Sequence, residues 1–120
     1  MPDQIELRGL VASGRIGALP DEQERPQPLE VDLDVVLDLA KPGATDDLDD
    51  TVDYGVLCAM VERIITTEQF TLLERLAERI AEVALADERI DEVTIAVRKL
   101  RPPVPQQLAT SGVRISRRRG

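Results

Sequence analysis

The sequence predicts an α+β fold, with a four-stranded antiparallel sheet that carries two helices on one face. Apolar and polar residues alternate in two segments near the beginning of the chain and in two near its end, which is the period of a half-buried strand. Two segments between them have apolar residues at helical spacing. The predicted order is therefore ββααββ. Because 120 residues are the size of one domain, we expect residues 1–120 to form a single unit.

The first two strands should pair as a hairpin. The first is predicted to begin at Ile5 and to end near the glycines at 14–17, with Ile5, Leu7, Gly9 and Val11 alternating against Glu6, Arg8 and Leu10. A loop at 20–28, rich in proline, glutamine and acids, leads into the second strand. There Leu29, Val31, Leu33, Val35, Leu37 and Leu39 should face one way, and Glu30, Asp32, Asp34 and Asp38 the other. Such a one-sided pattern is typical of an antiparallel pair with a single packed face.

The helices and the last two strands follow. Lys41, Pro42 and Gly43 should end the second strand, and an acidic connection at 44–51 precedes the first helix. The apolar positions of the helices are Val56, Leu57, Met60, Val61, Ile64 and Ile65, then Leu72, Leu73, Leu76, Ile80, Val83 and Ala84. The third strand carries Val93, Ile95 and Val97, and the last carries Ala109, Val113 and Ile115. With both helices on one face, the sheet edges stay open, so we expect neighbouring subunits to close them.

Composition argues against several classes of function. A net charge of -8 disfavours nucleic-acid binding, and the arginines at 117–119 are expected to form a solvated tail. No apolar run reaches the roughly 18 residues of a membrane span, and no signal segment is visible, so we expect a soluble, cytoplasmic protein. Histidine is absent and Cys58 is the one cysteine, so the usual zinc ligands are missing. The acids at 46–50 lack the spacing of a calcium loop, and we expect no metal.

Lys99 is the most informative single residue. It continues the series of Ile95 and Val97, so its side chain should point to the apolar side of the strand. Burying an ammonium group costs several kcal/mol unless the group is paired or gives up its proton, which favours an acid/base role. The alternative is a lysine at a strand end whose amine reaches water.

Three other candidates have ordinary explanations when taken alone. Thr71 and Glu74 match the TxxE pattern of a capping box, in which the glutamate caps the helix. Glu22 lies in an acidic loop, where a solvated carboxylate is common. Tyr54, the one tyrosine, stands at the start of the first helix, where amphipathic packing is expected.

Together these residues belong to a pattern that resembles the dihydroneopterin aldolase family over nearly the whole chain. The matching segments are IELRG at 5–9, GRIG at 14–17 followed by Glu22, DDLDDTVDYG at 46–55, LLERLAERI at 72–80, and VRK at 97–99 followed by PPVP at 102–105. One departure is Ile16, where many members have histidine. The resemblance implies the tunnelling fold, in which ββααββ subunits close into a ring and two tetrameric rings stack as a homo-octamer.

The resemblance also implies a site and a reaction. Lys99, Tyr54 and Glu22 match the catalytic residues, and Glu74 matches the carboxylate that anchors the pterin. Leu73, Thr51 and Val52 match residues that line the pterin, with Thr51, Val52 and Tyr54 supplied by a neighbouring subunit. The implied reaction is a retro-aldol cleavage of 7,8-dihydroneopterin in tetrahydrofolate biosynthesis, without metal or cofactor, because the pterin supplies its own electron sink.

Two alternatives remain open from the sequence. An epimerase acting at carbon 2′ of dihydroneopterin or its triphosphate would share the fold, and Arg15, Arg98 and Arg101 are candidates for phosphate contacts. A noncatalytic pterin-binding ring is the second alternative, although such a protein would have little reason to retain all four polar site residues.

Overall fold

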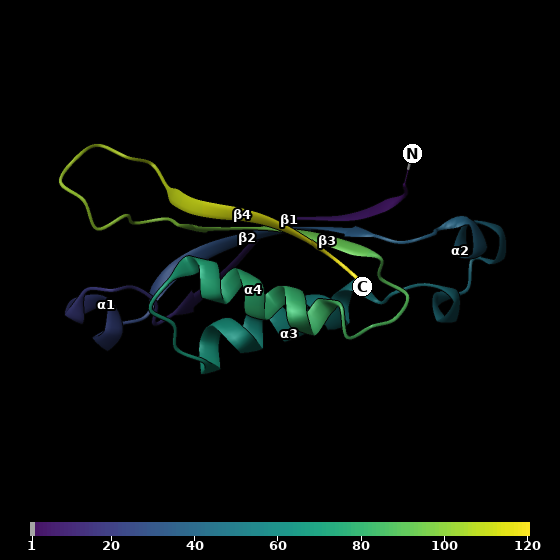
Figure 1. Ribbon diagram of the computed structural model, residues 1–120, viewed down its shortest axis with the longest axis horizontal. Helices are drawn as coiled ribbons and strands as arrows, with labels where there is room; N and C mark the ends of the chain where they lie inside the picture. Colours follow the sequence, from purple (N-terminus) through teal and green to yellow (C-terminus); the bar gives the residue numbers. More distant parts are fainter. Residues whose placement is uncertain (1) are drawn as a thin grey trace.

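Four antiparallel strands form one sheet in the order β1-β2-β3-β4, in a computed structural model that describes residues 2–120 (Figure 1). The strands are β1 (Gln4–Gly14), β2 (Gln27–Val36), β3 (Glu92–Lys99) and β4 (Ser111–Arg118). Helices α3 (Tyr54–Thr67) and α4 (Leu73–Ala84) cover one face of the sheet. The predicted fold class is therefore confirmed. Three short elements were not predicted: α1 (Pro20–Glu24), α2 (Ala40–Thr45) and the 3-10 helix η1 (Leu48–Asp50).

The core lies between the sheet and the two long helices. Val31, Val35, Val93 and Val97, which alternate along the two central strands, are fully buried. The helices contribute most of the predicted apolar positions to the core, namely Leu57, Val61, Ile64, Ile65, Leu73, Leu76, Ile80 and Ala84. The predicted positions Val56 and Leu72 are instead 56% and 52% exposed, because Val56 lies on the outer side of α3 and Leu72 precedes α4. Both strands and helices are thus held mainly by the burial of one apolar face.

A bulge changes the phase of β1. The pairing with β2 shifts between Leu7 and Leu10, and Gly9 has φ of 72°, a conformation that glycine adopts without steric cost. The freed amide of Gly9 donates to the Asp32 carboxylate at 2.8 Å. Beyond the bulge the core-facing residues are Leu10 and Ala12, whereas Val11 is 51% exposed. The predicted placement of Val11 on the buried face was therefore wrong.

The ends of two strands also differ from the prediction. β2 ends at Val36, and Pro42 lies in the first turn of α2 instead of ending a strand. A proline is tolerated there because the backbone amides of a first turn have no hydrogen-bond partner within the helix. β4 begins only at Ser111, so Ala109 precedes it. The terminal arginines are held in place: Arg117 pairs with Glu78, Arg118 pairs with Glu92, and Arg119 donates to backbone carbonyls. The arginines are exposed to solvent, as expected, but they do not form a loose tail, because Arg117 and Arg118 belong to β4 and Arg119 follows it directly.

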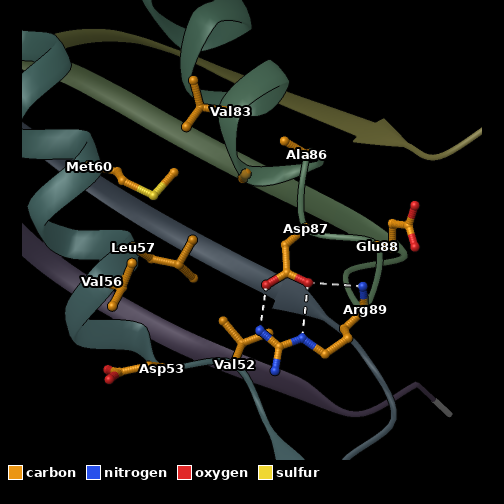
Figure 2. A pocket seen from close by; sticks show the side chains of 11 residues that line it. Val52, Asp53, Val56, Leu57, Met60, Val83, Ala86, Asp87, Glu88 and Arg89 are labelled. Carbon is orange, nitrogen blue, oxygen red and sulfur yellow. Dashed lines mark hydrogen bonds and ion pairs between the residues drawn. The ribbon is translucent and has the colours of Figure 1, made fainter.

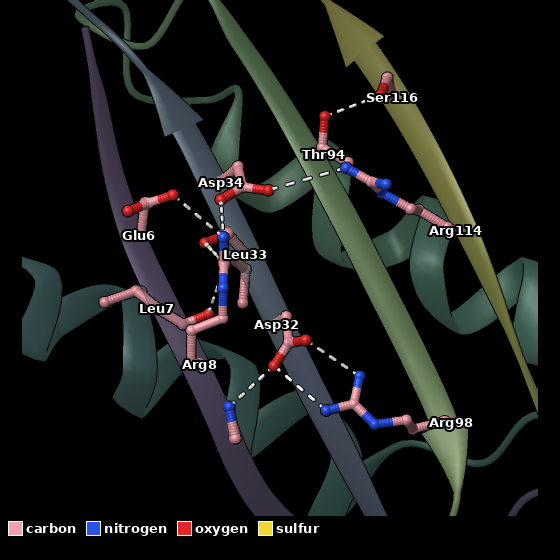
Figure 3. A network of polar contacts seen from close by, with 11 residues as sticks. Glu6, Leu7, Arg8, Asp32, Leu33, Asp34, Thr94, Arg98, Arg114 and Ser116 are labelled. Carbon is pink, nitrogen blue, oxygen red and sulfur yellow. Dashed lines mark hydrogen bonds and ion pairs between the residues drawn. The ribbon is translucent and has the colours of Figure 1, made fainter. Parts of the chain in front are cut away.

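The face of the sheet away from the helices is polar (Figure 3). Arg98 donates to Glu30 at 2.6 Å and to Asp32 at 3.0 Å, and Arg8 donates to Asp34 at 2.6 Å. The hydrogen bond from Arg98 is the main cause that lowers the pKa of Asp32 below its ordinary value. Arg98 is therefore committed to this face, on the opposite side of β3 from its neighbour Lys99. Within residues 2–120, no helix is long and apolar enough to cross a bilayer.

Candidate active site

Lys99 and Glu22 form an ion pair at the end of β3. The Lys99 amine donates to the Glu22 carboxylate, with 2.6 Å between Nζ and Oε2. Both side chains are largely buried, with exposed fractions of 13% for Lys99 and 9% for Glu22. Lys99 thus lies on the apolar side of its strand, as the alternation predicts, and its amine has a charged partner instead of reaching bulk water.

The chain around α1 holds Glu22 in this position. Pro20 begins α1, where its missing amide costs nothing, and the Glu22 carboxylate also accepts from the Gln27 side chain at 3.0 Å and the Leu19 amide at 3.4 Å. Burial raises the pKa of Glu22, but the hydrogen bonds from Lys99, Gln27 and Leu19 outweigh it and leave this pKa below its ordinary value. The solvated loop carboxylate that the sequence allowed as an explanation is therefore ruled out.

Gly17 leaves room for the Glu22 carboxyl group. It has φ of 141°, and a Cβ atom at this position would overlap the carboxyl carbon and oxygens of Glu22. We expect Gly17→Ala to lower the free energy of unfolding by about 1–3 kcal/mol, because of the backbone strain, and to reduce kcat/KM by displacing Glu22 from Lys99. Urea denaturation and steady-state kinetics would measure both. Gly43→Ala is the control, since a Cβ atom there meets no atom of residues 2–120 within 4 Å. Equal behaviour of the two variants would contradict the prediction.

The ionisation of Glu22 should make stability depend on pH with a definite sign. Because the pKa of Glu22 is lower in the folded chain than its ordinary value, the carboxylate stabilises the fold above that value, and the contribution is lost as the pH falls through the folded pKa. We expect Glu22→Gln to be less stable than the unsubstituted chain at pH 7, with a difference that shrinks below about pH 4. Urea denaturation between pH 7 and pH 3 would measure it. A difference that stays constant with pH would count against this ion pair.

Glu74 and Leu73 lie at the same end of the molecule as Lys99. The α3–α4 connection is tied to the β1–α1 loop, because the amide of Gly17 donates to the Phe70 carbonyl at 3.1 Å and the amide of Phe70 donates to the Arg15 carbonyl at 3.3 Å. This contact places the beginning of α4 beside the loop that carries Glu22 (Figure 1).

The Glu74 carboxylate is exposed and has no hydrogen-bond or ion-pair partner among residues 2–120. The residue before α4 is Leu72 and not Thr71, so the capping box that the TxxE pattern indicated does not form. The neighbouring Leu73 is 9% exposed and belongs to the core. A carboxylate in the first turn of a helix is favoured by the helix dipole, and it is free here to accept hydrogen bonds from a ligand.

The remaining candidates, Thr51, Val52 and Tyr54, lie at the opposite end of the folded molecule. Tyr54 is the first residue of α3 and is 60% exposed, whereas the other end of this helix packs near β1 beside Gly14. A helix of 14 residues is about 20 Å long, so Tyr54 is far from Lys99 in one chain. Val52 is buried, and the Thr51 carbonyl accepts from Arg89. The structure therefore brings together Glu22 and Lys99 near Leu73 and Glu74, but does not bring Thr51, Val52 or Tyr54 to them.

One cavity lies near each of these two ends of the molecule. The larger, about 660 Å³, lies between α3 and the end of α4 and is lined by Val52, Val56, Met60, Val83 and Arg89, among others (Figure 2). The smaller, about 180 Å³, adjoins Glu22 and includes Arg25 and Arg101. We take the Lys99 end as the candidate active site, although its cavity is the smaller of the two, because the buried ion pair lies there. Within residues 2–120, no group of three or more metal-ligating side chains is placed to hold an ion.

Arg89 and Asp87 were missed by the sequence reasoning. They form an ion pair in the α4–β3 turn, beside the Thr51–Tyr54 segment. Neither residue interrupts a helical or strand period, so the sequence offered only a polar turn at this position. The hydrogen bond from Arg89 to the Thr51 carbonyl joins residues 38 positions apart, and local sequence patterns do not predict such a contact.

Comparisons with known proteins agree on one family. The family model described as FolB, dihydroneopterin aldolase, matches residues 5–116. The dihydroneopterin aldolase of Streptomyces coelicolor is 41% identical over 102 residues, covering 85% of this chain and 86% of that one. The Bacillus subtilis dihydroneopterin aldolase is 34% identical over 118 residues, 98% of each chain.

Solved structures show the same likeness. A structure of Escherichia coli dihydroneopterin aldolase in complex with neopterin has a TM-score of 0.88 at 30% identity, covering 96% of this chain and 98% of that one. A urate oxidase from Bacillus sp. TB-90 has a TM-score of 0.66 at 12% identity, covering 81% of this chain and 37% of that one, and shares the fold alone.

Proposed function

This chain belongs to the dihydroneopterin aldolase family and is an aldehyde-lyase, and from that premise we propose how its residues cleave 7,8-dihydroneopterin. The products are 6-hydroxymethyl-7,8-dihydropterin and glycolaldehyde, as a step of tetrahydrofolate biosynthesis in the cytoplasm. The observation that carries the proposal is the buried Lys99–Glu22 ion pair, at the same end of the fold as the Glu74 carboxylate, which has no partner within residues 2–120.

The reaction is a retro-aldol cleavage. A base removes the proton of the hydroxyl group on carbon 2′, the bond between carbons 1′ and 2′ breaks, and glycolaldehyde leaves. The electron pair of that bond moves into the C6=N5 imine of the dihydropterin, so the substrate provides the electron sink that a lysine Schiff base or a metal ion provides in other aldolases. The resulting enamine takes up a proton at carbon 1′ to give the hydroxymethyl product.

Lys99 is the group that moves protons in this scheme. Its amine donates to Glu22, and 13% of its side chain is exposed, so it is positioned to act as a proton-transfer group on a bound substrate. Glu22 fixes the amine and accepts a proton from it, which leaves the amine free to take the proton of the carbon 2′ hydroxyl. Tyr54 supplies a phenol that assists proton transfer, and with 60% of its surface exposed it is available to a substrate bound by another chain.

Glu74 anchors the pterin. Its carboxylate accepts two parallel hydrogen bonds from the 2-amino group and the adjacent ring N–H, which is the geometry that a carboxylate suits. Leu73 supplies an apolar wall next to it, and Thr51 and Val52 line the pterin from the neighbouring subunit. No metal or cofactor takes part in these roles.

Each active site is built from two chains. The distance between the Lys99 end and the Tyr54 end of one subunit supports this arrangement, since residues with complementary proposed roles lie at opposite ends of α3. In the described part of the chain, β1 and β4 are the edge strands of the sheet, and their outer backbone groups are available for pairing with other subunits. We propose an octamer of two tetrameric rings, with Thr51, Val52 and Tyr54 entering the site of a neighbour.

An assay of the products tests the proposed function. Purified protein would be incubated with 7,8-dihydroneopterin and a chelator, and glycolaldehyde and the pterins would be followed by chromatography. We expect glycolaldehyde and 6-hydroxymethyl-7,8-dihydropterin in equal amounts. Epimerised substrate without glycolaldehyde would replace the aldolase with a 2′-epimerase, and the absence of any product would leave a noncatalytic pterin-binding ring.

One observation favours the epimerase as second candidate. Arg25 and Arg101 line the cavity beside Glu22, and neither has an ion-pair partner among residues 2–120, so both are available to a phosphorylated substrate. Arg98 is not available, because it pairs with Glu30 and Asp32 on the other face of the sheet. The same assay with dihydroneopterin triphosphate would distinguish the two substrates.

A further inference from the structure

The Arg89 side chain connects the α4–β3 turn to the segment that precedes α3. Its Nε and Nη2 atoms contact the two oxygens of the Asp87 carboxylate, at 3.0 and 2.7 Å (Figure 2). Its third nitrogen, Nη1, donates to the carbonyl of Thr51. Among residues 2–120, no other side chain from outside Thr51–Tyr54 donates to the backbone of that segment. Arg89 is therefore its main side-chain tether.

The Asp87 end of this contact is itself fixed. The Asp87 carboxylate accepts from the backbone amide of Arg89 at 3.0 Å, which closes the turn on itself. Arg119 donates to the carbonyls of Leu85 and Ile90 in the same turn, at 2.6 and 2.9 Å, and Ile90 is fully buried. These hydrogen bonds fix the turn that carries Arg89, and a fixed turn is what a positioning residue requires.

The bond to Thr51 determines where the next amide points. The peptide between Thr51 and Val52 is trans, so its C=O and its N–H point in opposite directions. With the carbonyl held toward Arg89, the Val52 N–H is directed away from Arg89, and within residues 2–120 it has no acceptor. A backbone donor left without a partner is costly unless water or a ligand accepts its hydrogen bond.

We propose that Arg89, supported by Asp87, is a positioning residue that sets the orientation of the Thr51–Val52 peptide toward the pterin. The proposal rests on the proposed function, in which these two residues line the substrate bound by a neighbouring subunit. Arg89 does not touch the substrate in this scheme. It acts through the peptide, and it links the beginning of α3 to the turn before β3.

Steady-state kinetics give the first test. We expect Arg89→Gln to reduce kcat/KM on the order of 10- to 100-fold, mainly through KM, because a misplaced donor weakens the binding and alignment of the substrate. Arg89→Lys should fall between, since one ammonium group reaches the Thr51 carbonyl or the Asp87 carboxylate but not both. Arg79→Gln is the matched control, because Arg79 also contacts a carboxylate, that of Glu68, through two nitrogens but lies away from the Thr51 segment.

A mixing experiment locates the defect in one half of the site. Two variants with different tags would be co-expressed, and hybrid oligomers purified through both tags. A hybrid of Arg89→Gln with Lys99→Ala contains sites that combine the intact Lys99 of one chain with the intact Thr51–Tyr54 segment of the other. A hybrid of Arg89→Gln with Tyr54→Phe contains no such site, because both changes lie in the same half.

The expected result is a kinetic component with both the KM and the turnover per intact site of the unsubstituted protein in the first hybrid, and no such component in the second. Recovery in both hybrids, recovery in neither, or an unchanged kcat/KM in Arg89→Gln would overturn the proposal. A hybrid of Lys99→Ala with Tyr54→Phe serves as a separate control. If that hybrid does not regain activity, sharing of sites between chains is wrong, and the role of Arg89 falls together with it.

Discussion

Lys99→Ala should lower kcat by about 10²- to 10⁴-fold, the range that one positioned proton-transfer group contributes. The change removes the amine that would take the proton from the carbon 2′ hydroxyl. The chain should still fold, because the Glu22 carboxylate keeps hydrogen bonds from Gln27 and from the Leu19 amide. KM should change less than kcat, since pterin binding is assigned to Glu74 and not to Lys99.

Lys41 offers the control for this experiment, because it is the one other lysine in the chain. It is 74% exposed and pairs with Asp50 at the far end of the molecule. Single-turnover kinetics with Lys99→Ala and Lys41→Ala would separate the chemical step from product release. Normal turnover in Lys99→Ala would show that another group carries the proton transfer.

Glu74→Gln should raise KM on the order of 10- to 100-fold with a smaller change in kcat. A hydrogen bond to a charged group contributes about 1.5–3 kcal/mol. The glutamine amide keeps one acceptor, its carbonyl oxygen, but places its NH₂ group opposite an N–H donor of the pterin. Because Glu74 is exposed and without a partner in residues 2–120, its replacement should leave the thermal stability nearly unchanged.

Glu62→Gln is the matched control for Glu74. Glu62 is an exposed glutamate of α3 whose carboxylate has no partner among residues 2–120. Titration of both variants with the product 6-hydroxymethyl-7,8-dihydropterin would measure the dissociation constants directly. Equal affinity in the two variants would remove Glu74 from the pterin site.

The alternation of residues in β2 and β3 was sufficient to predict these strands and the direction of their side chains. Every second residue of β2 from Leu29 to Val35 is buried, and Lys99 follows Val97 to the same face. Helices α3 and α4 were predicted for the same reason, since their apolar stripes repeat within a few residues. The proposed roles of Glu22, Tyr54 and Glu74, by contrast, came from the resemblance to a family, because each residue has an ordinary explanation in isolation.

The sequence by itself determined the four strands, the two long helices and the lysine on the apolar face, because each depends on a repeat that a short window contains. Only the tertiary structure decided that Glu22 meets Lys99 across 77 positions, that Gly9 shifts the phase of β1, and that Arg89 holds Thr51. It also decided that Tyr54 and Lys99 lie at opposite ends of one chain. Such contacts join residues far apart in the sequence, and their geometry depends on how whole elements pack, which no local periodicity encodes.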